Sequence, residues 1–409
     1  MALTGMRFLI LNADYPKFLI SHYEATPRLS ELSYAEQMAA RNASLFGVAD
    51  FYSHNFRAHG HEAADIHVNN PWLQYRWARE HGVKVAAPSP IRPDEVAGGR
   101  DPVSVGRRTV AYLKPVLRPI VRRFRRRPIG LSDWEATVLR AQIEEFCPDI
   151  ILNQEMTYVR SPVLRSLKRP GRQIIGQIAS TLPKDESFDV YDLLISSLPN
   201  LVQWFRARNV RAELNRLAFE PSVLSLLGQP PPRDIALSFV GSLSPVHRSR
   251  IAFLEYVAQH APLKIWGNGI ERIPRTSVLR SCYQGEAWGR EMYEILQRSR
   301  ITLNHHIDLA ENWANNMRLY EATGAGALLL TDQKRNLQEM FALGEHVTAY
   351  ESPEDCVRQI NLFLANEPLR ASIAAKGQRH TINTHNYFRR TGEIVEMSTT
   401  FEPRTADWA

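Results

Sequence analysis

One stretch of the chain places a cation and a carboxylate one helical turn apart, directly before a strongly apolar strand. The segment NMRLYEATGAGALLLTD, residues 316–332, carries Arg318 and Glu321 three residues apart, so a helix would present both near one side. Asn315 and Asn316 precede them, and the free N–H groups of a helix N-terminus suit a pyrophosphate. Arg318 adds a fixed positive charge, and the Glu321 carboxylate could accept both hydroxyls of a ribose. The alternative is a solvated ion pair on an amphipathic helix.

A second candidate site follows the strand predicted at residues 235–243. Gly241 and Ser242 end that strand, and a small residue lets the backbone approach a diphosphate closely. Arg248 follows at the start of the next helix, where its charge could stabilise a departing diphosphate. A routine turn between a strand and a helix is the alternative.

Other polar residues also end predicted strands, which is where ligands of open α/β sheets bind. Trp266 ends the strand at residues 263–266 and could bound a nucleobase or belong to a structural turn. His305 and His306 follow the strand at residues 300–305; each either faces the site or is a partly buried polar residue. Glu155 follows a strand at residues 149–154 and is the candidate base for an acceptor hydroxyl if the reaction inverts configuration. Further acceptor contacts are expected from a loop that carries Asp14, His22 and Glu24.

Strands that alternate with helices position these residues in both halves of the chain. A buried strand at residues 6–13 precedes a predicted long loop at residues 14–33, after which helices and strands alternate. The alternation restarts after residues 227–234, where three consecutive prolines predict a stiff linker. This order predicts parallel sheets covered by helices on both faces. We therefore expect an α/β fold with domains at residues 1–226 and 235–385, and a C-terminal segment at 386–409 that packs back on the first domain.

Length and composition agree with a two-domain globular protein. The chain has 409 residues, of which 44% are hydrophobic and 23% charged, and this balance excludes disorder on a large scale. No window approaches the roughly 18 consecutive apolar residues of a membrane-spanning helix. The first twelve residues lack the pattern of a signal peptide, so we expect a cytoplasmic protein. The three cysteines lie far apart and outside any CxxC pair, which predicts reduced thiols and no zinc site.

The net charge of +7 is concentrated in one segment. Nine Lys and Arg and no acidic residue lie between residues 107 and 127, and the rest of the chain has a net charge of −2. Within this insertion, at about residues 100–130, an apolar stripe interrupted by Pro115 and Pro119 indicates a broken amphipathic helix. It predicts peripheral contact with anionic lipid or a lipid-phosphate-linked acceptor at the inner membrane face, or else a solvated insertion. Nucleic acid is not expected as a partner, because interleaved aromatics and a known binding module are lacking.

Residues from about 235 to 381 resemble the C-terminal domain of group 1 glycosyltransferases, in particular the branch of the spore-maturation CgeB-like proteins. The resemblance rests on short motifs: Phe239–Ser242, His247 and Arg248, Trp288 and Gly289 with Tyr293 and Leu296, NMRLYEATGAGALLLTD, and Leu337–Phe341 before Gly344. It implies the GT-B fold, in which two Rossmann-like doubly wound domains face an interdomain cleft and the C-terminal domain binds the donor nucleotide. It also implies that Glu321 matches the glutamate that holds the donor ribose.

One position departs from the family pattern. Many retaining members of the family have a second glutamate eight residues before the ribose glutamate, and Trp313 occupies that position here. Glu311 lies nearby but out of register. Retention or inversion of the anomeric configuration therefore stays open.

Together, the residues and the resemblance predict a metal-independent, hexosyltransferase-like enzyme. It would move a sugar from a nucleotide diphosphate sugar, used as co-substrate without a further cofactor, to a glycan, lipid-linked or protein acceptor. Cell-surface polysaccharide biosynthesis is the expected setting. Two alternatives stay open. A nucleotide-sugar epimerase or hydrolase would need an extra acid/base pair that the sequence does not identify, and a non-catalytic glycan-assembly or binding protein would keep the fold without turnover.

Overall fold

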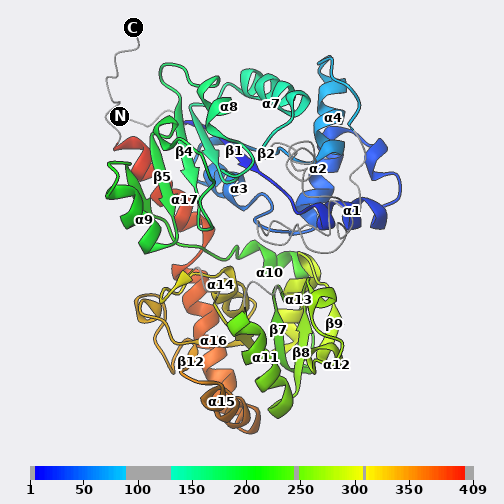
Figure 1. Ribbon diagram of the computed structural model, residues 1–409, viewed down its shortest axis with the longest axis vertical. Coiled ribbons are helices and arrows are strands. Elements are labelled where there is room, and N and C mark those ends of the chain that lie inside the picture. The colour runs from blue at the N-terminus through cyan, green and yellow to red at the C-terminus, as the bar shows by residue number, and fades with distance from the viewer. Residues whose placement is uncertain (1–4, 89–129, 244–247, 307–309, 401–409) are drawn as a thin grey trace, which may run out of the picture. The chain divides into compact units, whose positions relative to one another are not determined.

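The computed structural model describes residues 5–88, 130–243, 248–306 and 310–400. By its internal contacts the chain divides into two compact units, and Figure 1 shows their helices and strands. Of these described residues, the first unit comprises those within 1–41, 64–177 and 182–192, and the second those within 42–63, 178–181 and 193–409. The basic run at residues 107–127 lies outside the described residues. Within the described part, no helix is both long enough and apolar enough to cross a membrane.

The first sheet has six strands in the order β2-β1-β3-β4-β5-β6. β1 pairs with β3 in parallel register, Phe8 opposite Ile150 and Leu9 opposite Ile151. All residues of β3 and β5 are buried, as expected for strands covered by helices on both faces. The strands are β1 (Arg7–Asn12), β2 (Glu62–His67), β3 (Ile150–Asn153), β4 (Gln173–Gln177), β5 (Leu193–Ser196) and β6 (Ala212–Leu214). The helices are α1 (Pro16–Ala25), α2 (Tyr34–Ala43), α3 (Phe51–Ala58), α4 (Pro71–Glu80), α7 (Asp133–Phe146), α8 (Ser161–Arg165), α9 (Pro199–Arg206) and α10 (Ser222–Leu227).

Residues 14–33, predicted as a long loop, instead contain helix α1 and a short 3₁₀ turn at Leu29–Glu31. Pro16 occupies the first turn of α1, where a proline costs no hydrogen bond and its fixed φ suits the helix. Phe18 and Leu19 are buried and anchor the helix. The loop prediction, for a segment with two prolines, was wrong because Pro16 lies at a position where a proline begins a helix.

The second sheet is also parallel, in the order β12-β11-β10-β7-β8-β9. The strand order reverses between β7 and β10, and ligands of doubly wound sheets bind at such a switch point. The strands are β7 (Ile235–Val240), β8 (Leu263–Trp266), β9 (Tyr283–Gly285), β10 (Ser299–Asn304), β11 (Leu328–Asp332) and β12 (Thr348–Tyr350). The helices are α11 (Arg248–His260), α12 (Leu279–Cys282), α13 (Arg290–Arg298), α14 (Met317–Gly324), α15 (Pro353–Ala365), α16 (Glu367–Thr384) and α17 (Tyr387–Thr399).

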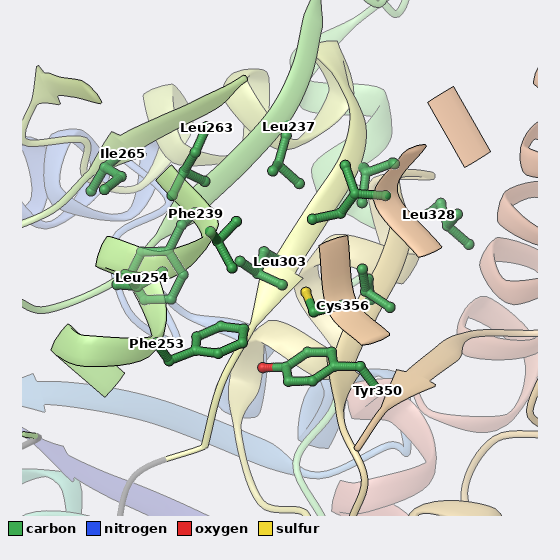
Figure 2. Packing of buried hydrophobic residues seen from close by; sticks show 14 of the residues in the cluster. Leu237, Phe239, Phe253, Leu254, Leu263, Ile265, Leu303, Leu328, Tyr350 and Cys356 are labelled. Atoms are coloured by element: carbon green, nitrogen blue, oxygen red, sulfur yellow. The ribbon is translucent and has the colours of Figure 1, made fainter. Parts of the chain in front are cut away.

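A buried apolar cluster fixes the second sheet against α11 and α15. Figure 2 shows Leu237 and Phe239 of β7, Leu303 of β10 and Cys356 of α15 in this cluster, with Phe253 of α11 beside Tyr350 of β12. Each fully buried side chain of this size contributes roughly 1.5–3 kcal/mol to stability. The cluster therefore holds β7 and β10 rigidly, and these are the strands whose carboxyl ends carry the candidate site.

Residues before the proline-rich linker also belong to the second unit. The amide of Phe219 donates to the carbonyl of His385 over 2.9 Å, and Phe219 forms a parallel bridge with Asn386 at the start of α17. The Phe219 ring lies against Gly324, where an added Cβ would come within 2.3 Å of it. α17 itself packs on α3, with Tyr387 against Phe51.

Candidate functional site

The carboxyl ends of β7, β10 and β11 gather the polar residues of the second sheet at the switch point. In register, Leu303 of β10 lies opposite Phe239 of β7, and Asn304 lies opposite Thr331 of β11. The three strands therefore end at one edge. α14 begins beyond β10, at the same edge, with Asn316 as its N-cap.

Asn316 organises the first turn of α14. Its side-chain oxygen accepts from the amide of Arg318 over 2.7 Å, which satisfies one of the free N–H groups of the helix start. Its side-chain nitrogen donates to Oδ1 of Asn304 over 2.9 Å and ties the helix to the end of β10. Asn315, the residue before the cap, is half-buried. The predicted helix start is thus anchored to the sheet.

Arg318 and Glu321 form an ion pair, with Nη1 2.8 Å from Oε2. Nε of Arg318 donates to the carbonyl of Val240 over 3.2 Å, so the guanidinium lies at the end of β7 as well. Only 12% of the Arg318 side chain and 7% of the Glu321 side chain are exposed. The alternative of a solvated pair on a helix surface is therefore wrong: this is a buried pair at the switch point.

Burial and the guanidinium act on Glu321 in opposite directions. Burial raises the pKa of the Glu321 carboxyl above its usual value, and the charge of Arg318 lowers it, with burial the larger effect. A buried carboxylate gains stability from each additional hydrogen-bond donor. The hydroxyls of a ribose would supply such donors.

A chain of hydrogen bonds runs along the sheet edge from Asn304 to His306. Nδ2 of Asn304 donates to Oγ1 of Thr331 over 2.9 Å, and Oγ1 of Thr331 donates to Oδ1 of Asp332 over 3.2 Å. Oδ1 of Asp332 lies 2.6 Å from Nδ1 of His306 and also accepts from the His306 amide over 3.0 Å. Asn304, Thr331 and Asp332 were not predicted from the sequence as site residues. Their positions at the ends of apolar strands were the available signal.

His305 turns away from His306 toward the apolar cluster. Its Nδ1 lies 2.9 Å from the hydroxyl of Tyr350, and its ring stacks on Phe253 at 4.6 Å between centroids. Nη2 of Arg250 donates to the His305 carbonyl over 2.8 Å. Burial, reinforced by Arg250, lowers the pKa of His305 to about 4 despite the opposing charge of Asp332, so its imidazole is neutral at pH 7.

The loop after β7 is pinned to the end of β8. The Gly241 amide donates to the carbonyl of Trp266 over 2.9 Å, and Nη1 of Arg250 donates to the Ser242 carbonyl over 3.3 Å. The Trp266 side chain is largely buried. Gly267 has φ +148°, and an added Cβ would lie 1.9 Å from the Gly241 carbonyl oxygen. Arg248 is the first residue of α11, and its side chain lies outside the described part of the structure.

A pocket of about 620 Å³ opens beside this edge, within the second unit. It lies between the first turns of α11 and α15. Its lining combines aromatic faces with charged and hydroxyl groups: Ser249, Ala252, Phe253, Tyr256, His305, Asp332, Gln333, Lys334, Tyr350, Glu351, Ser352 and Pro353.

Glu155 belongs to the first unit, directly after β3. Its amide donates to Oδ1 of Asn153 over 3.1 Å, and the Thr157 hydroxyl donates to its carboxylate. The neighbouring Gln154 donates through Nε2 to Oε1 of Gln177 over 2.7 Å, so the ends of β3 and β4 carry linked polar groups. This placement is the one expected for a residue at the carboxyl edge of the first sheet.

Asp14, expected as an acceptor contact, is enclosed by Arg41 and His67 of its own unit. Nη2 of Arg41 lies 2.5 Å from Oδ1 of Asp14, and Nδ1 of His67 lies 3.1 Å from Oδ2. The Asp14 and His67 side chains are completely buried. Burial alone would raise the pKa of Asp14, but His67 and Arg41 hold it well below its usual range. This arrangement joins the ends of β1 and β2 to α2.

Comparison with protein families gives one match. Residues 248–396 match the model of a family described as glycosyl transferase-like. The prediction of a glycosyltransferase is thereby confirmed for the class of the protein, on the segment that carries Arg318 and Glu321. A search of the curated proteins found no match.

Solved structures resemble the fold over nearly its whole length. A glycosyltransferase from Rickettsia africae is 10% identical, with a TM-score of 0.53, covering 97% of this chain and 98% of that one. Anabaena Alr3699/HepE in complex with UDP-glucose is 11% identical, with a TM-score of 0.54, covering 97% and 100%. Sucrose-phosphate synthase from Thermosynechococcus elongatus is 11% identical, with a TM-score of 0.55, covering 97% and 98%. At this identity the likeness is one of fold, and the predicted GT-B architecture is confirmed.

Proposed function

We propose that this chain, a glycosyltransferase of the GT-B fold, moves a sugar from a nucleotide diphosphate sugar to a glycan, lipid-linked or protein acceptor. The observation that carries the proposal is the buried ion pair of Arg318 and Glu321, held at the carboxyl edge of the second sheet. A buried pair is weak support for stability alone, because desolvation offsets much of its attraction. At a switch point it offers a cation and a carboxylate to one ligand.

In this proposal the donor binds along the ends of β7 and β10. The first turn of α14, Arg318 and Arg248 stabilise the diphosphate, and Gly241 and Ser242 let the backbone approach it. Glu321 accepts from the ribose hydroxyls. The remaining donor contacts are proposed for Trp266, His305, Asn315 and Asn316. No metal is invoked, because positive side chains and helix N–H groups can carry the leaving-group charge.

UDP is the first nucleotide to test. The structure of Anabaena Alr3699/HepE holds UDP-glucose, and further structures of the same protein hold UDP with glucose and UDP alone. These proteins share the fold of this chain at 11–12% identity. This likeness supports a nucleotide sugar as partner, and the nature of the base is left to the experiment.

For the acceptor side, we propose Glu155 as the base that takes the hydroxyl proton if configuration is inverted. A lipid-linked acceptor would fit the basic run at residues 107–127, which would contact the inner membrane face from the cytoplasm. Membership of the CgeB-like branch, and a role in cell-surface polysaccharide biosynthesis, belong to the same proposal and rest on the motifs quoted above.

The test is a thermal-shift screen with UDP, GDP, dTDP, CDP and CMP. It compares the wild type with Arg318→Ala and Glu321→Ala, backed by the milder Arg318→Lys and Glu321→Gln. Arg28→Ala, at an exposed arginine paired with Glu31, is the control. Each ligand-induced shift is measured against the same variant without ligand, because the substitutions themselves lower stability. A nucleotide at 100 times its Kd adds about 2.7 kcal/mol of stability.

We expect one nucleotide to stabilise the wild type and Arg28→Ala, and to stabilise the site variants much less. Failure of every nucleotide to shift a folded wild type would favour a non-catalytic protein that keeps the fold. Equal shifts in all variants would place the donor site elsewhere.

A further inference from the structure

We infer that His306 is a further donor-binding residue, whose imidazole contacts the donor diphosphate through Nε2 while Asp332 positions the ring. The inference rests on the proposed function, because the anion it invokes is the diphosphate of the donor. It adds His306 to the donor contacts proposed above, beside its neighbour His305.

The contacts of His306 fix which way its ring is held. The His306 side chain is completely buried, and its Nδ1 lies 2.6 Å from Oδ1 of Asp332. Burial alone would raise the pKa of Asp332, but His306, His305 and Lys334 hold it well below its usual range, so the carboxyl is ionised. An ionised carboxylate only accepts hydrogen bonds, and Nδ1 therefore carries the proton. Nε2 is left as the nitrogen for a ligand.

Nε2 of His306 is buried and has no hydrogen-bond partner among the residues that the structure describes. A buried polar atom without a partner costs free energy, and native proteins rarely keep one without a reason. By contrast, His305 has its Nδ1 on the Tyr350 hydroxyl and its ring on Phe253. Of the two histidines, His306 is the one with a buried nitrogen that lacks a hydrogen-bond partner among the described residues.

The hydrogen-bond chain described above joins His306 to the proposed diphosphate site. It passes from Asp332 through Thr331 and Asn304 to Asn316, and from there to the amide of Arg318. The same chain therefore fixes the imidazole and the first turn of α14. An anion held by that turn would lie at the sheet edge where His306 follows the end of β10.

Charged and titratable groups from several elements surround His306. The titratable groups that the structure describes around it are Asp332 and Lys334 from β11 and the turn after it, His305 beside it, Arg250 from α11 and Tyr350 from β12. Lys334 lies 3.2 Å from Oδ2 of Asp332, and His305 is neutral at pH 7. A protonated imidazole at His306 would donate through both ring nitrogens, with Nδ1 on Asp332. In its protonated form, Nε2 donates to a phosphate oxygen.

The experiment compares a nucleoside diphosphate with its monophosphate by titration calorimetry. The probe is whichever of UDP, GDP, dTDP and CDP binds the wild type most tightly, with the matching monophosphate. The variants are His306→Ala, His306→Gln and Asp332→Asn. His260→Gln, on an exposed histidine at the end of α11, is the matched control. The affinity for the monophosphate shows whether each variant keeps a folded nucleotide site.

We expect His306→Ala to reduce the preference for diphosphate over monophosphate roughly tenfold, the loss of one charge-assisted hydrogen bond. His306→Gln, which keeps a donor, should retain part of the preference. Asp332→Asn should also reduce the preference, because the ring loses the carboxylate that positions it.

A preference that changes less than twofold in His306→Ala and in His306→Gln, with monophosphate affinity intact, overturns the inference and leaves the proposed function standing. Failure of the folded wild type to bind any of the four diphosphates overturns both. A loss that is equal for diphosphate and monophosphate would assign His306 a structural role and also contradict the inference.

Discussion

Arg318 and Glu321 form an ion pair of 2.8 Å across one turn of α14. Arg28 and Glu31, in the first unit, form an ion pair of the same length. Both pairs have a spacing of three residues. They differ in burial. The side chains of Arg318 and Glu321 are 12% and 7% exposed. Those of Arg28 and Glu31 are 81% and 60% exposed. Spacing and distance alone therefore say nothing of the role of such a pair.

We predict that breaking the buried ion pair of Arg318 and Glu321 lowers the stability of the protein. Arg318→Met or Glu321→Gln should each lower the free energy of unfolding by about 3–5 kcal/mol, because the remaining charge is left buried without a partner. The double variant Arg318→Met/Glu321→Leu should be closer to the wild type, since no uncompensated charge remains. Urea unfolding followed by circular dichroism measures these differences.

The control for this prediction is the exposed pair. Arg28→Met or Glu31→Gln should change the free energy of unfolding by less than about 1 kcal/mol. A similar loss at both pairs would show that burial is not what sets their energies.

The N-cap of α14 should serve both stability and binding. Asn316→Ala should cost about 1 kcal/mol of stability, the usual value of a cap, because it leaves the Arg318 amide without its acceptor. It should also weaken nucleotide binding, since it frees the helix start from Asn304. Asn386→Ala removes the cap of α17, which accepts from the Arg389 amide over 2.8 Å, and is the matched control. The Asn386→Ala variant should lose a similar amount of stability and keep its nucleotide affinity. Equal nucleotide affinities in the Asn316→Ala and Asn386→Ala variants would contradict a role of Asn316 at the site.

The close approach of β7 and β8 makes Gly267 sensitive to a single methyl group. Gly267→Ala should destabilise the protein by about 1–3 kcal/mol beyond the backbone strain, because the new Cβ would overlap the Gly241 carbonyl. Gly285, at φ +122°, has no atom within 4 Å of such a Cβ. Gly285→Ala therefore carries the strain without the overlap, and the difference in thermal unfolding between the two variants isolates the contact. Equal melting temperatures would show that the loop moves aside freely.

Asp14 should contribute stability that depends on pH in a defined direction. Its pKa in the folded protein lies below the unfolded value of about 3.9, so folding favours the ionised form. The contribution is complete above that unfolded value and is lost as pH falls through the folded pKa. The difference in unfolding free energy between the wild type and Asp14→Asn should thus stay constant from pH 7 to about 5 and shrink below about 4. Urea titrations at several pH values measure it, and a difference that grows on acidification would contradict the assignment.

The sequence predicted contacts within one element better than contacts between elements. Arg318 and Glu321 were found because helical geometry brings residues three apart together. The pairing of His306 with Asp332 depends on the register of β10 against β11, in which Asn304 lies opposite Thr331. That register is a property of the folded sheet, and 26 residues separate the two partners. The burial that distinguishes Arg318 from Arg28 is likewise set by packing.

The fold class was predictable because it, too, depends on patterns within single elements. Long apolar strands such as β7 and β11 carry a strong local signal, and they define the alternation of an α/β protein. β6 and β9, which the sequence analysis missed, have three residues each and little buried surface. Strands this short owe their conformation to the neighbour with which they pair.

The contact of Phe219 with Gly324 bears on where the chain could be cut. The prolines at residues 230–232 look like a natural place to separate the two halves. A fragment that begins there would lack Phe219, its hydrogen bond to His385 and its ring against the end of α14. It would expose Gly324 and the other groups that this ring covers, at the far end of α14, whose first turn carries Arg318. A nucleotide-binding fragment of this protein should therefore begin upstream of Phe219 and not at the linker.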